Sequence, residues 1–199
     1  MERVVRTLSV IMLMASMMTC TNPFKTRDPA EPDTGQQAWV QPGSPEIVLE
    51  NLRNAIFDLN VENYMRTLSD PERTGREFRF IADPSVVAEN PGLFAVWSRA
   101  HERSYFSLLR ALTPDDSLRL LSLQQIQSSF FADSAFFVEN YTLRIHHTQQ
   151  DQNIPVVVQG EARFWLTVDE VGEWSIYRWE DRSLGSAPPW SVLKEVYGK

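Results

Sequence analysis

The stretch GEARFWLTVDEVGEWSIYRWED, residues 160–181, decides the fold class of this 199-residue chain. Its first half alternates apolar and polar residues, as a strand with one buried face does, and residues 154–159 extend that pattern. Turn-forming residues at 169–172 then separate it from a second strand at 173–181. The sequence therefore predicts a long antiparallel hairpin in the C-terminal part of the chain.

The segments before the hairpin predict helices first and strands afterwards. Ser44-Pro45-Glu46 is typical of a helix start, and an apolar face repeats at helical spacing up to Leu59. Further elements are expected as a helix at 61–68, a short strand at 77–82, a helix at 93–111, and strands at 117–127 and 135–147. We expect only strand after residue 116. This order predicts one α+β domain at 45–199, with N-terminal helices packed on a curved antiparallel sheet.

The layout resembles the NTF2-like superfamily, the cone-shaped fold of ketosteroid isomerase-type and SnoaL-type proteins. The matching stretches are LNVENYMRTLSD at 59–70, EFRF at 77–80, a tryptophan-bearing helix, and the hairpin at 160–181. The hairpin is similar to that of small NTF2-like lipoproteins of unassigned function. The resemblance implies the fold but does not indicate a particular activity, because proteins with this fold have many different activities. A lipocalin-like or other antiparallel barrel is the alternative, and the opening helices argue against it.

The N-terminus is typical of an exported lipoprotein. Arg3 and Arg6 precede an apolar run at 8–18, and Cys20, the only cysteine, follows at the expected end of a signal peptide. Lipidation of Cys20 explains a cysteine that has no partner for an intramolecular disulfide. The sequence therefore predicts a signal peptide at 1–19 and a lipid anchor at Cys20.

An ordinary secreted protein is the alternative to a lipoprotein. Met17-Met18-Thr19 departs from the usual lipid-attachment motif, so cleavage after Ala15 or Ser16 would leave Cys20 as a free thiol. We favour lipidation. The expected location is a bacterial cell envelope, and Thr21, in place of an inner-membrane retention Asp, favours the periplasmic side of the outer membrane in a two-membrane organism.

Residues 20–44 are predicted to comprise the lipidated cysteine and a flexible tether. The segment is rich in Pro, Thr, Asp and Gln and has no helical or strand period, so it buries too little apolar surface to fold. Trp39 and Val40 are the exceptions, and we consider them candidates for docking on the domain.

Charge excludes one class of partner. The chain has a formal net charge of −7, which becomes −8 without residues 1–19 because two basic residues and one acidic residue are removed. An acidic domain is a poor nucleic-acid binder, and its membrane contact is expected through the lipid anchor.

The search for catalytic chemistry finds no cofactor motif and no metal site. His146 and His147 point to opposite faces of a predicted strand, and His101 lacks a second histidine at helical zinc spacing. Acid/base chemistry in an apolar cone would need a carboxylate or histidine with a shifted pKa and a nearby donor. The candidate pocket residues are Tyr64, Trp97, His101, Glu102 and Asp181. The alternative, which we favour, is that the charged ones are solvated or paired at element ends.

Aromatic residues of the hairpin provide the other functional hint. Trp165, Tyr177 and Trp179 are predicted to share an exposed sheet face and form an interface. The equal alternative is that Pro188-Pro189-Trp190 covers these aromatic residues.

The expected function is that of an envelope module that binds a ligand or partner. The candidates are a second copy of the chain, an envelope protein or a small apolar ligand. A small isomerase or dehydratase acting on an apolar ligand is the alternative function.

Overall fold

A curved five-stranded sheet in the order β1-β5-β4-β3-β2 is the centre of the domain. The computed structural model describes residues 39–198. Four long strands pair antiparallel in sequence: β2 (Arg119–Phe130), β3 (Ser134–Ile145), β4 (Val157–Val168) and β5 (Trp174–Ser183). The short β1 (Arg79–Ile81) pairs parallel with β5 at one edge. The predicted strands, including the hairpin, are confirmed with small changes of boundary.

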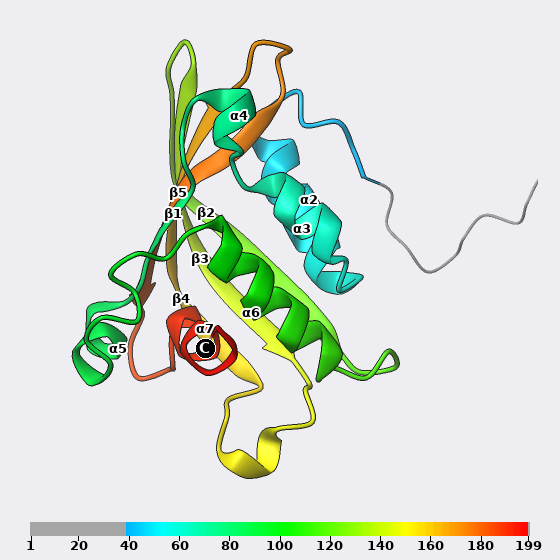
Figure 1. The fold of residues 1–199 in the computed structure, drawn as a ribbon, viewed down its shortest axis with the longest axis vertical. Helices are drawn as coiled ribbons and strands as arrows, with labels where there is room; N and C mark the ends of the chain where they lie inside the picture. The colour runs from blue at the N-terminus through cyan, green and yellow to red at the C-terminus, as the bar shows by residue number, and fades with distance from the viewer. Residues whose placement is uncertain (1–38, 199) are drawn as a thin grey trace, which may run out of the picture. The chain divides into compact units, whose positions relative to one another are not determined.

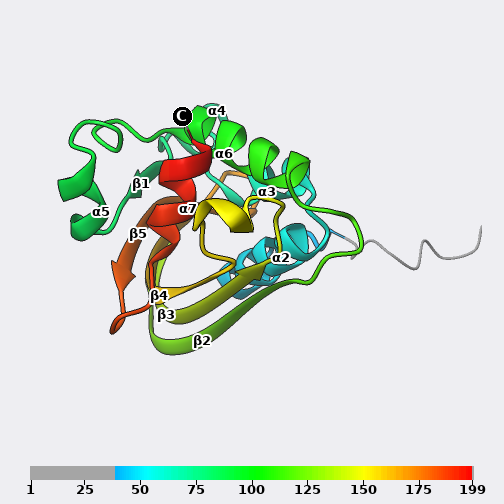
Figure 2. The same ribbon diagram turned by 90° about the horizontal axis from the view of Figure 1, so that it is seen from below.

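The concave side of the sheet is covered by helices (Figures 1 and 2). They are α2 (Pro45–Phe57), α3 (Val61–Thr67), α6 (Arg99–Ala111) and α7 (Trp190–Tyr197). The sheet curves around them, and α6 contacts both α3 and α7. The α+β class with helices on a curved antiparallel sheet is therefore confirmed. None of the helices among residues 39–198 is long and apolar enough to cross a membrane.

Several predicted boundaries were wrong because local capping overrides apolar spacing. The helix expected at 93–111 begins at Arg99, since His101 accepts a hydrogen bond from the backbone of Ser98 and closes a capping box there. Pro84, expected only to end a strand, opens the short helix α5 (Pro84–Glu89), which Asp83 caps. The helix α4 (Pro71–Thr74) and a single 3₁₀ turn (Gln150–Gln152) were also not predicted.

The expectation of strand alone after residue 116 was wrong at the C-terminus, where α7 lies. Its eight residues follow Pro188-Pro189, and Pro189 is the N-cap residue. Two acceptors from the sheet receive its first backbone N–H groups. Tyr141 Oη accepts from the Trp190 amide at 2.6 Å, and Asp181 accepts from the Ser191 amide at 2.6 Å. The sheet therefore positions this helix and the side chains it carries.

The end of the predicted tether docks on the domain. Asn51 exchanges two hydrogen bonds with the backbone of Val40, at 2.6 and 3.1 Å, and the Trp174 amide donates to the Pro42 carbonyl at 2.8 Å. Arg66 lies 3.9 Å above the Trp39 ring. The docking expected of Trp39 and Val40 is confirmed. The signal peptide, Cys20 and the tether up to residue 38 lie outside the described residues.

Candidate functional site

A buried ion pair occupies the space between the helices and the concave sheet face. Lys194 of α7 binds Glu102 of α6, and both side chains are fully buried. The same carboxylate accepts hydrogen bonds from Tyr64 Oη at 2.6 Å and from Trp97 Nε1 at 2.7 Å. Both oxygens of Glu102 are therefore used by donors from three other segments.

Aromatic rings enclose the ammonium group. Lys194 Nζ lies 3.9 Å from the ring centroid of Phe80 and 4.0 Å from that of Trp179, with Tyr105 and Trp190 farther away at 5.3 and 6.0 Å. Burial lowers the pKa of Lys194 to about 8, while the neighbouring Glu102 carboxylate opposes that shift. The rings attract the ammonium through their negative faces, which replaces part of the hydration it has lost.

Three of the five predicted pocket residues meet at this ion pair. Tyr64 and Trp97 donate to Glu102 as described, and burial together with that carboxylate raises the pKa of Tyr64. His101 lies beside Trp97, with ring centroids 5.4 Å apart, and its Nδ1 serves the helix cap. The favoured interpretation of Glu102 was that of a solvated or paired charge. Glu102 is paired, with Lys194, but the pair lies in the core and is not solvated.

Asp181, the fifth predicted residue, belongs to a neighbouring buried cluster. It accepts from Tyr141 Oη at 2.6 Å and from the hydroxyl of Ser191 at 2.5 Å, besides the Ser191 amide. Burial raises the pKa of Asp181, although these hydrogen bonds favour its charged form. Asp181 is fully buried and its partners are hydroxyl and amide groups, so it is neither the solvated nor the paired charge that the favoured interpretation expected. Its contacts fasten α7 to the sheet.

An acidic residue that the sequence analysis did not single out lies in an open pocket. Glu139 of β3 is 3% exposed, and burial raises its pKa to about 7, opposed only by the charge of Arg53. The pocket, about 190 Å³, lies between α2 and the strands β2 and β3. Leu49, Leu123 and Phe137 supply its apolar lining. A carboxyl group that titrates near neutral pH beside apolar walls has the properties of a general acid or base.

Only two of the three aromatic residues predicted to form an exposed patch lie at the surface. A β-bulge in the hairpin pairs Trp165 with Arg178 and Leu166 with Ile176, so Tyr177 is an extra residue. The strand then alternates out of the predicted phase, and Trp179 faces the core with no exposure. Its assignment to an exposed patch was therefore wrong.

Trp165 and Tyr177 remain at the surface, on the face of the sheet opposite the helices. With Phe136 and Phe131 they line a largely apolar hollow of about 390 Å³, which we call the outer hollow. Arg178 lies 4.7 Å over the Trp165 ring, and Arg76 lies 4.8 Å over the Tyr177 ring. Phe131 is 65% exposed, so the outer hollow has a projecting aromatic residue at its rim.

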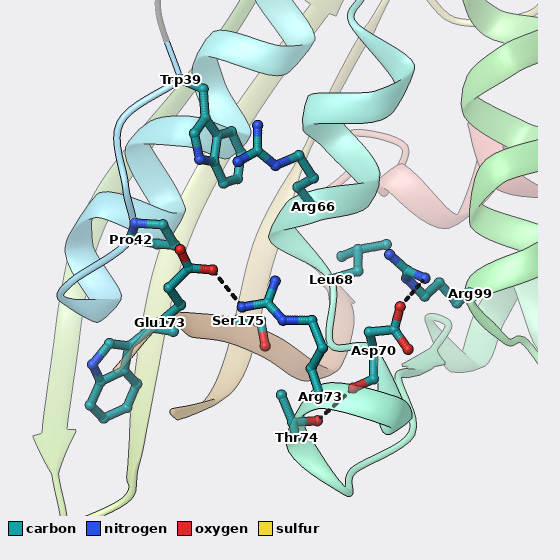
Figure 3. Close-up of a pocket in the computed structure, with 11 residues that line it drawn as sticks. Trp39, Pro42, Arg66, Leu68, Asp70, Arg73, Thr74, Arg99, Glu173 and Ser175 are labelled. Atoms are coloured by element: carbon teal, nitrogen blue, oxygen red, sulfur yellow. Dashed lines mark hydrogen bonds and ion pairs between the residues drawn. The ribbon is translucent and has the colours of Figure 1, made fainter. Parts of the chain in front are cut away.

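A further pocket, of about 60 Å³, is built where the docked tether meets the domain (Figure 3). Three arginines line it: Arg66 from α3, Arg73 from α4 and Arg99 from α6. Arg73 is bound by Asp169 and Glu173, and Arg99 by Asp70 at 2.9 Å. We call this the arginine pocket. Neither its place nor its residues were predicted, because four separate segments contribute to it.

Comparison with known structures defines the class of this domain as an α+β fold of helices on a curved sheet. No protein-family model and no curated protein matches the sequence. A protein from Novosphingobium aromaticivorans, provisionally assigned as an aromatic ring hydroxylase, is 12% identical over 75% of this chain and 92% of its own, with a TM-score of 0.53. A conserved protein from Planctomyces limnophilus is 11% identical over 69% and 91%, with a TM-score of 0.52.

An NTF2-like protein with a cystatin-like fold from Novosphingobium aromaticivorans is 12% identical over 70% of this chain and 79% of its own, with a TM-score of 0.47. The first two structures share the α+β fold of this chain over most of their own length, and the NTF2-like superfamily is what the sequence resemblance implies. At these identities the likeness concerns the fold alone, so function must be argued from the sites.

Proposed function

We propose that this protein is a lipid-anchored module of a bacterial envelope that binds a partner, and that its NTF2-like cone is a packed scaffold. The observation that supports this is the Lys194–Glu102 pair. It occupies, together with the surrounding rings, the interior in which a ligand would otherwise lie. Both carboxylate oxygens of Glu102 accept hydrogen bonds, and the bond from Lys194 holds α6 and α7 together. A partner would therefore bind at the surface of the domain, where the outer hollow is the largest of the apolar sites described.

Anchoring through Cys20 leads to the first test. Cys20→Ala in the full-length chain should move the protein from the membrane fraction to the soluble fraction, because the acidic domain has no affinity of its own for anionic lipid. Immunoblotting of fractionated cells measures this, and Thr21→Ala is the matched control that should stay with membranes. A Cys20→Ala protein that still sediments with membranes would contradict lipid anchoring.

The occupant we propose for the outer hollow is a second copy of this chain. The surface offers both parts of a two-fold contact: Phe131 is 65% exposed at its rim, and Trp165, Tyr177 and Phe136 line the hollow beside it. A two-fold axis would place the Phe131 ring of each copy in the hollow of the other, as isologous interfaces require. The buried centre would be aromatic with an arginine-containing rim, which is the usual composition of an interface.

We expect the purified protein to be dimeric at micromolar concentration, and Phe131→Ser to make it monomeric, because the change removes the ring that fills the partner's hollow. An aromatic anchor of this kind contributes roughly 2 kcal/mol or more to association, about a thirtyfold change in the dimer dissociation constant. Sedimentation velocity over a range of concentrations measures it. Phe57→Ser, at an exposed phenylalanine of α2, is the matched control. A protein that is monomeric at every concentration would contradict the proposal that a second copy occupies the outer hollow. The occupant would then be a different envelope protein or an apolar ligand.

Acid/base catalysis on a small apolar ligand is the second candidate function, and Glu139 is the observation that favours it. Glu139 is buried but lines an open pocket, whereas the predicted pocket residues Tyr64, Glu102 and Asp181 line none of the pockets described above. The pKa of Glu139, raised by burial to about 7, suits proton transfer near neutral pH. In this case the reaction would take place beside α2.

A further inference from the structure

Three hydrogen-bond donors that lack partners lie around the arginine pocket. They are Trp39 Nε1, Arg99 Nε and the hydroxyl of Ser175, each buried and without a hydrogen bond among the residues that the structure describes. Buried polar atoms are nearly always satisfied, and leaving one unsatisfied is unfavourable. Three around one small pocket indicate that something else completes it.

Charge indicates the nature of the missing group. Arg66 stacks on Trp39 at 3.9 Å and makes no ion pair within residues 39–198, whereas Arg73 and Arg99 are already paired with carboxylates. The pocket therefore offers one uncommitted guanidinium in addition to its unpaired donors. Arg66, Trp39 and Ser175 surround the same pocket from three elements (Figure 3). The indole and guanidinium N–H groups only donate, the Ser175 hydroxyl can donate, and the lining carboxylates of Asp70 and Glu173 are already paired with Arg99 and Arg73. Unpaired donors with one uncommitted positive charge suit an oxyanion.

We propose that the arginine pocket binds a small oxyanion, a carboxylate or phosphate group presented by a ligand. The volume of about 60 Å³ admits such a group and excludes a large organic body, so the rest of the ligand lies outside. This site is separate from the outer hollow and from the Glu139 pocket, and it stands whichever of the two functions proposed above is correct.

Binding at this site would also restrain the tether. Trp39 and Pro42 form one side of the pocket, and the Pro42 carbonyl accepts from the Trp174 amide at 2.8 Å. A ligand held between Trp39 and Ser175 therefore joins the segment that leads to Cys20 to strand β5. Occupancy of the pocket thus stabilises the docking of Trp39 and Pro42 on the domain.

Nuclear magnetic resonance titration of the purified protein tests this proposal, because the Trp39 indole N–H is a direct reporter. Inorganic phosphate and N-acetylglycine are the two probes, with sodium chloride at matched ionic strength as the reference. We expect a saturable shift of the Trp39 indole signal with at least one oxyanion, and slower hydrogen exchange of the Trp174 amide in its presence. Saturation by phosphate alone or by N-acetylglycine alone identifies which oxyanion the ligand carries.

Two variants separate a specific site from general screening of charge. Arg66→Gln, at an exposed position, and Ser175→Ala should each weaken binding, the former about tenfold because it removes a charged hydrogen bond. Arg103→Gln is the matched control, since Arg103 is paired with Glu62 away from the pocket. Circular dichroism verifies that each variant is folded. A linear response equal to that with sodium chloride, or equal affinity in Arg66→Gln and Arg103→Gln, would overturn the proposal.

Discussion

Replacement of Lys194 by methionine should destabilise the domain by about 3–5 kcal/mol, because it leaves the Glu102 carboxylate buried without its counter-charge. Methionine keeps most of the volume among the surrounding rings, so the loss reports charge rather than a cavity. Both side chains are fully buried, so the solvent screening that weakens surface ion pairs does not apply here. Urea unfolding followed by tryptophan fluorescence measures the free energy of unfolding.

The double variant Lys194→Met, Glu102→Gln distinguishes a buried charge from general damage to the core. With both charges removed, the amide can still hydrogen-bond Tyr64 and Trp97, so the double variant should recover most of the loss. The coupling energy from the four proteins should exceed about 2 kcal/mol. If the losses of the two single variants simply add, the two charges are not coupled, and the pair does not hold the scaffold together.

The sequence predicted the sheet better than the interior because strand alternation is a local signal. The pattern at 154–181 was sufficient to identify the hairpin and its turn. It could not reveal the bulge at Tyr177, because one extra residue reverses the faces without changing which residues are apolar. Trp179 was consequently assigned to the surface, although it packs against Lys194 in the core.

Glu102 was a predicted pocket residue, but its most important partner was not foreseen. Lys194 lies 92 residues away on a short helix that the sequence analysis did not predict. A lysine near a C-terminus is normally solvated, and only the tertiary arrangement of α6, α7 and the sheet buries it. The arginine pocket was missed for the same reason, since its arginines come from three helices and meet only after folding.

A usable signal for Glu139 did exist. In the strand expected at 135–147, Phe137 and Tyr141 lie on one side, and Glu139 lies between them at the same period of two. An acidic residue at an inward position either has a partner or titrates unusually. That inference requires only the alternation that identified the strand.

Glu139→Gln should therefore make the protein more stable at about pH 8 and leave its stability unchanged at about pH 4. Burial raises the pKa of Glu139 in the folded protein from 4.5 to about 7, so the folded state holds a proton that the unfolded chain has already released. Stability attributable to this residue is present below pH 4.5 and is lost as the pH rises through 7. The ionised side chain costs up to about 3 kcal/mol above that range, and glutamine avoids this cost.

Thermal or urea unfolding of both proteins across the pH range measures the effect, with Glu161→Gln as the matched control because Glu161 is paired with Arg163 on the outer face of the sheet. A Glu139→Gln protein that is less stable at about pH 8 would mean that the carboxylate is stabilised in its charged form, and the pocket would then be unsuitable for proton transfer.

A Glu139→Gln protein that is more stable at about pH 8 has a functional implication. An unfavourable charge kept in an open pocket is the usual sign of a site where activity outweighs stability. The expected stabilisation would therefore strengthen the case for acid/base chemistry beside α2, even with the cone interior closed by Lys194.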